Sequence, residues 1–92
     1  MQIFVVVAED EPDYERLHKA IQSKYPADHY RIAPSTWLVA SGSPVGDVAK
    51  ALGISERGKI GGILLRISNY SGFASADIWD WLKTKADAQL DG

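Results

Sequence analysis

The stretch Ile3-Phe4-Val5-Val6-Val7-Ala8 decides the fold. These six consecutive residues are all apolar and include four β-branched side chains, a composition that predicts a β-strand buried on both faces. A strand with one face in water would instead alternate apolar and polar residues. The strand is followed by Glu9-Asp10-Glu11-Pro12, whose carboxylates and proline predict the start of a helix that runs to about Lys24.

The rest of the sequence continues with strands and helices of similar length. Alternation at Tyr30 and Ile32 predicts a short edge strand stopped by Pro34, and the short connection that follows predicts a hairpin. Serine and proline at the helix starts and glycine at one helix end mark the helix boundaries. Strands are therefore expected at residues 3–8, around 30–32, at 36–40 and at 60–68, and helices at 12–24, at 44–52 and from 75 onward.

This order is strand, helix, strand, strand, helix, strand, helix, and it predicts one α+β domain spanning residues 1–92. With right-handed crossovers and the hairpin, this order gives a ferredoxin-like sandwich. It has an antiparallel sheet, two helices on one face and an extra C-terminal helix. Three of the strands lack the alternation that a wet face would impose. We therefore expect the second face of the sheet to be covered, either by Trp79 and Trp81 of the C-terminal helix or by a second copy in a homodimer.

Composition limits the classes of protein to which the chain can belong. With 46% hydrophobic and 24% charged residues in a chain of 92, it resembles an ordinary globular protein, and the absence of cysteine excludes disulfides and thiolate metal sites. No apolar run is long enough for a membrane helix and no basic leader opens the chain, so we expect a cytoplasmic protein without a membrane partner. A net charge of −2 does not indicate nucleic-acid binding.

The end of the first strand carries the acidic residues that could do chemistry. Glu9 and Asp10, followed by Glu11 and Asp13, could hold Mg²⁺ through oxygen ligands if two such clusters met across a dimer. The competing interpretation is that these carboxylates cap a helix and complement its dipole. Apart from Mg²⁺ in the nuclease hypothesis, we expect no cofactor.

The remaining polar and aromatic residues give weaker signals. His18 and His29 have no metal-site spacing, and we expect them at the rim, with Asp28 as one candidate to tune His29. The basic residues Arg57, Lys59 and Arg66 could form a patch for nucleic acid, to which Trp37 or Tyr70 would add stacking surface. The alternative for the tryptophans is core or interface packing, and the interface candidates are Trp37, Trp79 and Trp81.

Two segments carry a resemblance to a known group. Ser35-Thr36-Trp37-Leu38-Val39, followed by a capped short helix and an apolar strand, and Trp79-Asp80-Trp81-Leu82-Lys83 make the chain similar to small bacterial proteins of the SinR-family or CRISPR-associated-protein-two-like type. The resemblance implies a ferredoxin-like homodimer, with nuclease activity in some members and a structural role in spacer integration in others. The nuclease members place an aspartate where this chain has Glu9, with Asp10 one residue later.

The sequence leads to two main hypotheses about function. The first is a small homodimeric interaction module of this type without enzymatic activity. The alternative is a Mg²⁺-dependent ribonuclease, or an antitoxin-like nuclease, that uses Glu9 and Asp10. A third hypothesis, a regulator that binds a small molecule, would need an apolar pocket with convergent polar groups.

Overall fold

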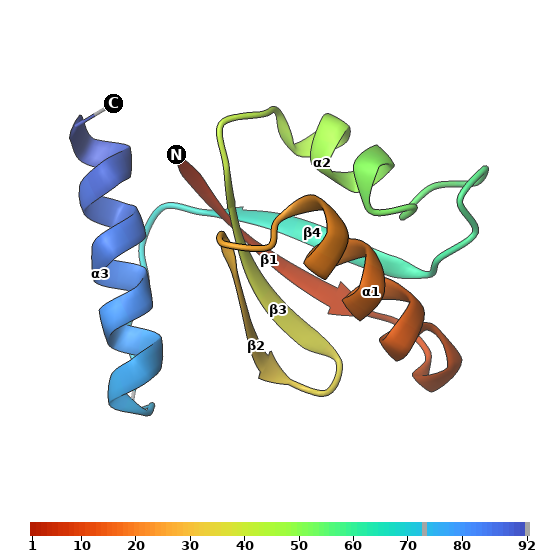
Figure 1. The fold of residues 1–92 in the computed structure, drawn as a ribbon, viewed down its shortest axis with the longest axis horizontal. Coiled ribbons are helices and arrows are strands. Elements are labelled where there is room, and N and C mark those ends of the chain that lie inside the picture. The colour runs from red at the N-terminus through yellow and green to blue at the C-terminus, as the bar shows by residue number, and fades with distance from the viewer. Residues whose placement is uncertain (73, 92) are drawn as a thin grey trace.

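One four-stranded antiparallel sheet organises the protein (Figure 1). The computed structural model describes residues 1–72 and 74–91, with side chains described up to Lys85. Its elements are β1 (Gln2–Ala8), the 3-10 turn η1 (Glu11–Asp13), α1 (Tyr14–Lys24), β2 (His29–Ala33), β3 (Thr36–Ser41), α2 (Val45–Ala51), β4 (Gly62–Ile67) and α3 (Ala76–Asp91). The four-stranded antiparallel sheet and the helices confirm the predicted α+β class.

β1 lies in the interior of the sheet, as its uninterrupted apolar sequence predicts. The strand order is β2-β3-β1-β4, and every neighbouring pair is antiparallel. At the middle of β1, Val5 lies opposite Leu38 of β3 on one side and Leu65 of β4 on the other. β2 and β4 are therefore the two edge strands.

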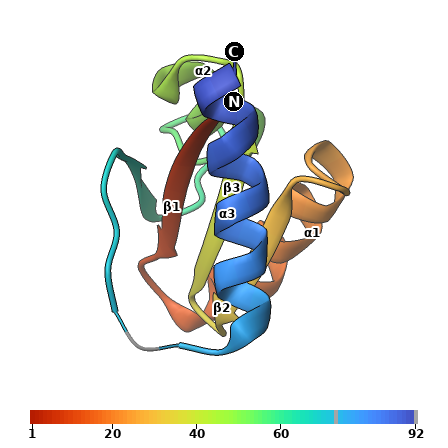
Figure 2. The same ribbon diagram turned by 90° about the vertical axis from the view of Figure 1, so that its left-hand side faces the viewer.

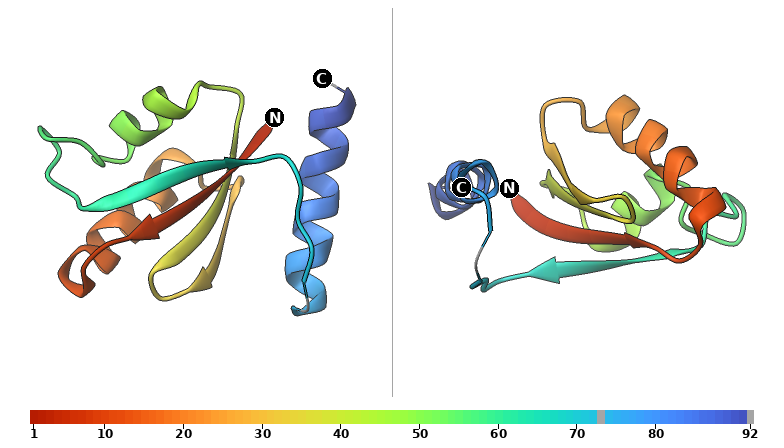
Figure 3. Two further views of the ribbon diagram at one scale, coloured as in Figure 1. Left: turned by 180° about the vertical axis from the view of Figure 1, so that it is seen from behind. Right: turned by 90° about the horizontal axis from the view of Figure 1, so that it is seen from below.

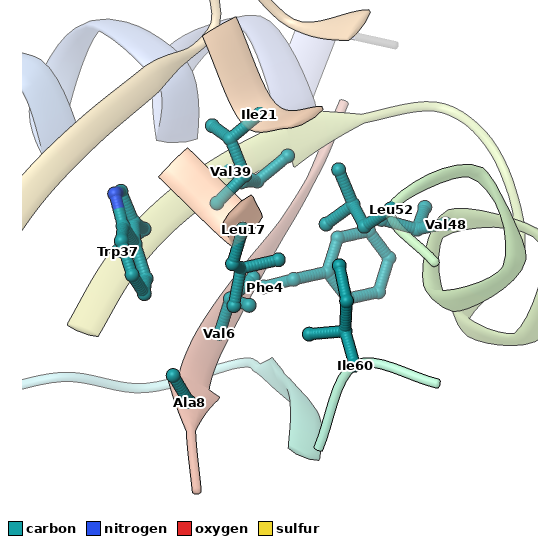
Figure 4. Packing of buried hydrophobic residues seen from close by; sticks show 10 residues of the cluster. All are labelled: Phe4, Val6, Ala8, Leu17, Ile21, Trp37, Val39, Val48, Leu52 and Ile60. Carbon is teal, nitrogen blue, oxygen red and sulfur yellow. The ribbon is translucent and has the colours of Figure 1, made fainter. Parts of the chain in front are cut away.

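Helices α1 and α2 cover one face of the sheet and enclose the main core. Leu17 and Ile21 of α1 are fully buried against the sheet, because their spacing places them on one side of the helix. Figure 4 shows them over Val6 and Val39 and shows the ring of Phe4 among apolar side chains from α2 and the loop before β4. The complete buried cluster is Phe4, Val6, Ala8, Leu17, Ile21, Trp37, Val39, Val48, Leu52 and Ile60.

Helix α3 covers part of the second face of the sheet. It lies across the end of the sheet, in front of β2 and β3 in the view of Figure 2, and contacts β1 and β2, whereas β4 stands to one side of it. Leu82 is buried there with Ile3 and Leu38, and Ile78, Trp79 and Trp81 pack around this second cluster. Of the two alternatives for covering this face, the C-terminal helix and a second copy, α3 supplies a cover, but an incomplete one.

The helix starts differ from the predicted caps. α2 begins at Val45, after Pro44, and has no side-chain cap; the N–H of Ser43 instead donates to Ser41 Oγ at 3.1 Å. α1 likewise has no side-chain cap, because the acidic segment first forms the turn η1. Pro12 lies within that turn, so the regular helix starts at Tyr14, later than expected.

Candidate interaction surface

The uncovered part of the second face lies on β4. The side chains of Ile63 and Leu65 point to this face and are 54% and 51% exposed, more than any other large apolar side chain of the described residues. They alternate with Leu64, which packs against the main core. We call Ile63 and Leu65 the β4 patch. Large apolar side chains that lie together at a surface mark sites of protein association more often than scattered ones do.

A groove separates the β4 patch from α3. It has a volume of about 350 Å³ and lies between the sheet, α3 and the loop that joins β4 to α3. Val5 and Leu38 form part of its floor, Ile78 and Trp79 line the helical side, and Asn69 supplies one of its few polar groups. The apolar surface of β4 therefore continues towards α3 and does not end at the strand.

The predicted acidic site lies at the end of β1, and its members have different roles. Asp13 accepts a hydrogen bond from the N–H of Gly61 at 3.1 Å and pairs with Arg16 at 2.9 Å. Its carboxylate thus ties the loop before β4 to the start of α1. Glu9 and Asp10 are exposed.

The structure gives little support for a preformed metal site at these carboxylates. Glu9 lines a hollow of about 270 Å³ together with Val7, Ala8, Gly62 and Ile63, and none of these neighbours offers a second acidic ligand. Among the side chains that the structure describes, in residues 1–72 and 74–85, no group of three or more histidines or carboxylates is arranged to hold a metal ion. A magnesium ion at Glu9 and Asp10 would need further ligands from water, substrate or a second copy.

The predicted basic residues do not form a compact patch. Arg57 and Lys59 lie in the loop before β4, whereas Arg66 lies near the far end of that strand. The length of β4 from Gly62 to Arg66 is already about 13 Å, because a strand rises by about 3.3 Å per residue. The three cations therefore spread along one edge of the molecule.

The three tryptophans occupy different environments. Trp37 is 0% exposed and lies in the main core under α1, so its ring is not available to a base or to a partner at the surface. Trp79 and Trp81 are half-buried where α3 meets the sheet, and Trp79 lies beside Tyr70 with the ring centroids 6.2 Å apart. Of the three, only Trp79 lines the groove beside the β4 patch.

The structure also brings together a polar cluster that the sequence analysis did not identify. The rings of His18 on α1 and His29 on β2 have centroids 6.2 Å apart. Trp37 Nε1 donates to His18 Nδ1, and Arg31 lies 5.0 Å from the Trp37 ring. His29 Nδ1 lies 2.6 Å from the carbonyl oxygen of Tyr25 and donates to it, because a carbonyl can only accept.

This cluster lowers the pKa of His18 below its ordinary value of 6.5. Burial is the largest cause, and the positive charge of Arg31 is the next; Glu15 acts in the opposite direction. Asp28, which the sequence offered only as a candidate to tune His29, pairs with Lys85 at 2.6 Å. No sequence spacing indicated the cluster, because its members meet only when α1 packs on the hairpin of β2 and β3.

The comparisons with known proteins add no relative to this picture. No protein-family model matches the chain, and no curated protein matches it either. None of the described helices is both long and apolar enough to span a membrane.

Proposed function

We propose that the chain is a homodimeric interaction module with a ferredoxin-like fold, of the CRISPR-associated-protein-two-like type and without enzymatic activity. The ferredoxin-like assignment is supported by the order β-α-β-β-α-β, by the strand order β2-β3-β1-β4 and by the packing of α1 and α2 on one face. The extra helix α3 on the other face is an addition to that pattern.

One observation carries the proposal of a dimer: α3 covers one part of the second face and leaves the β4 patch exposed. All side chains that β1 and β3 direct to this second face are apolar or small, so the whole face has the composition of a buried surface. Ile63 and Leu65 extend the same surface beyond the reach of α3. A second copy would cover them by the same hydrophobic effect that holds α3 in place.

The contacts and the exposure of the acidic residues support a function without catalysis. Asp13 is engaged by Gly61 and Arg16, so it contributes to folding, and the other carboxylates of the cluster, Glu9, Asp10 and Glu11, are exposed. Exposed carboxylates alone do not form the rigid constellation on which metal-assisted hydrolysis depends.

The test is a measurement of molar mass in solution, by light scattering or sedimentation, at micromolar concentration. The monomer has a mass of 10.1 kDa, and the proposal requires twice that value. Leu65→Lys should shift the protein towards the monomer, because it places a charge in the β4 patch. Val45→Lys is the matched control, because Val45 is also an exposed apolar side chain but lies on α2, away from this face. A wild-type protein that stays monomeric would refute the proposal.

The alternative function is a Mg²⁺-dependent ribonuclease that uses Glu9 and Asp10. The observation in its favour is that Glu9 lines a hollow at the end of β1, where a phosphate group could approach the carboxylate. The assay is cleavage of single-stranded RNA with Mg²⁺ and with EDTA, using the parent protein and the variant with Glu9→Ala and Asp10→Ala. Cleavage that needs both Mg²⁺ and these carboxylates would favour the ribonuclease over the interaction module.

A further inference from the structure

The edge strand β2 is attached to the rest of the molecule without a fully buried side chain. Its residues 29–33 are half-buried or exposed, and Ile32 is 44% exposed. In the described part of the chain it pairs with β3 alone, in an irregular register, and the right-hand view of Figure 3 places this yellow hairpin and β4 on opposite sides of β1. Just before β2, Asp28 pairs with Lys85 of α3. The polar contacts of β2 therefore contribute strongly to its attachment.

Two basic side chains of β2 face α1. His29 and Arg31 lie opposite Val39 and Trp37 of β3, whose side chains belong to the main core, so all four are on the helix face of the sheet. The ring centroids of His29 and His18 are 6.2 Å apart, and the Arg31 guanidinium lies 5.0 Å from the ring of Trp37, on which His18 stacks. His18 of α1 is thus surrounded by basic groups of β2.

The charges around His18 are divided unequally between α1 and β2. Among the groups that the structure describes, those that act on His18 are Arg31 and His29 from β2 and Glu15 from α1 itself. The carboxylate of Glu15 is already shared, because Arg31 Nη2 lies 3.3 Å from its Oε1. A positive charge on His18 is therefore repelled across the contact between α1 and β2.

Protonation affects the hydrogen bonds of the two histidines differently. His18 Nδ1 accepts the N–H of Trp37, so a proton on this nitrogen breaks the bond and leaves a buried indole N–H without an acceptor. His29 Nδ1 already donates to the carbonyl oxygen of Tyr25, and an imidazolium still donates there. His18 is therefore the member of the cluster whose contacts are sensitive to acid.

We propose that this cluster is an acid-sensitive latch, which holds β2 against α1 while His18 is neutral and releases the strand when His18 is protonated. α1 stays on the sheet, because its Leu17 and Ile21 are fully buried. Release of β2 also returns Arg31 Nε to water, and in the closed form this atom is buried without a hydrogen-bond partner. The inference is independent of the proposed homodimer.

The direction of the pH dependence follows from linkage. Burial and the charge of Arg31 lower the pKa of His18 in the closed form below its ordinary value of 6.5. Between that lowered pKa and 6.5, the released form binds more protons than the closed form. The latch therefore holds fully above about pH 6.5 and weakens as the pH falls below that value.

Hydrogen exchange at single residues, followed by NMR, tests the latch. Protection factors are measured at about pH 7.5 and about pH 5 for the amides that join β2 to β3, with the amides of β1 as the internal reference. We expect the β2 amides to lose about 10-fold of their protection in acid, because one additional proton on the released form changes the ratio of the two forms by up to about 10-fold per pH unit. The amides of β1 should keep their protection.

Matched substitutions separate the two histidines. His18→Asn keeps an acceptor for the N–H of Trp37 but does not titrate, and His29→Asn keeps a donor for the carbonyl oxygen of Tyr25. The loss of β2 protection in acid should disappear in His18→Asn and persist in His29→Asn. Arg31→Gln removes the charge from β2, so it should reduce the loss even if the first variant folds poorly.

The outcomes are distinct. A loss of protection that is confined to β2 in the wild type and disappears in His18→Asn supports the latch. Equal loss in β1 and β2 overturns it, because acid would then act on the whole fold. An unchanged acid effect in His18→Asn, or no acid effect in the wild-type protein, also overturns it. Arg57→Gln is the control for Arg31→Gln, because it removes one positive charge from a loop away from β2 and should leave the acid effect intact.

Discussion

Trp37 Nε1 donates a hydrogen bond to His18 Nδ1 at 3.0 Å, and the two rings are stacked with an interplanar angle of 24°. The indole N–H can only donate, so the bond fixes the neutral imidazole with its proton on Nε2. Trp37 comes from β3 and His18 from α1, so this bond satisfies the one polar atom of a buried tryptophan and joins the helix to the sheet.

The first prediction is that acid weakens the folded state through His18. Its pKa is lowered in the folded protein, so between that pKa and the ordinary value of 6.5 the unfolded chain binds more protons than the folded one. The contribution of His18 to stability is complete above about pH 6.5 and is lost as the pH falls below that value. Urea unfolding at a series of pH values between 8 and 5 measures it.

His18→Asn is the control for the pH prediction. The amide oxygen of asparagine can accept the Trp37 N–H, much as Nδ1 does, but it does not titrate. The variant should keep most of the stability at neutral pH and lose less of it between pH 6.5 and 5. His29 lies nearby and is unchanged in the variant, so an identical pH dependence in both proteins would assign the effect to another group.

The second prediction concerns the close approach of two glycines in the loop after α2. A Cβ on Gly58 would overlap the backbone of Gly53, which itself has a φ of +80°. Gly58→Ala should therefore cost more than the roughly 1 kcal/mol of an ordinary strained glycine replacement, because two backbone segments must separate. Thermal unfolding measures the loss.

Gly46→Ala provides the matched control for the glycine prediction. Gly46 lies within α2, and a Cβ there meets no atom within 4 Å. Alanine has the higher helix propensity, so this variant should be more stable by about 0.5 to 1 kcal/mol. Equal stability of the two alanine variants would show that the loop adapts without strain.

The third prediction concerns the bond between Asp13 and Gly61. Asp13→Ala removes the acceptor of the Gly61 N–H, and the loop before β4 loses its link to the start of α1. The expected cost is about 1 to 3 kcal/mol of unfolding free energy, typical of a partly buried hydrogen bond to a charged group. Glu56→Ala, at an exposed position in the same loop region, should change stability by less than about 0.5 kcal/mol.

The sequence predicted the elements well because each depends on local patterns. The uninterrupted run at residues 3–8 indicated a central strand, and β1 does lie between two others. The environment of Trp37 could not be derived in the same way, because a tryptophan on an apolar strand fits a core and an interface equally. His18 and His29 are distant in sequence and meet only through packing. The extent to which α3 covers the second face likewise depends on the path of the loop from residue 68 to 75.

The last prediction is that α3 can leave the sheet while the main core remains folded. Leu82 is its buried anchor on Ile3 and Leu38, and Lys85 pairs with Asp28 at 2.6 Å, next to β2. The cluster under α3 is separate from the larger one under α1 and α2. Leu82→Ala should therefore cost about 2 to 3 kcal/mol, and most of this cost should fall on the attachment of α3.

Hydrogen exchange and tryptophan fluorescence distinguish local release of α3 from global unfolding. In Leu82→Ala we expect faster exchange in α3 and a red shift from Trp79 and Trp81, with the amides of β1 still protected, because Phe4 and Val6 keep their contacts with α1 and α2. Thr84→Ala, at an exposed position on the same helix, should leave both signals unchanged. Release would also uncover Ile3 and Leu38, so the variant should bind more of a hydrophobic dye. Equal loss of protection in α3 and β1 would contradict the prediction, because it would mean that both faces of the sheet unfold as one unit.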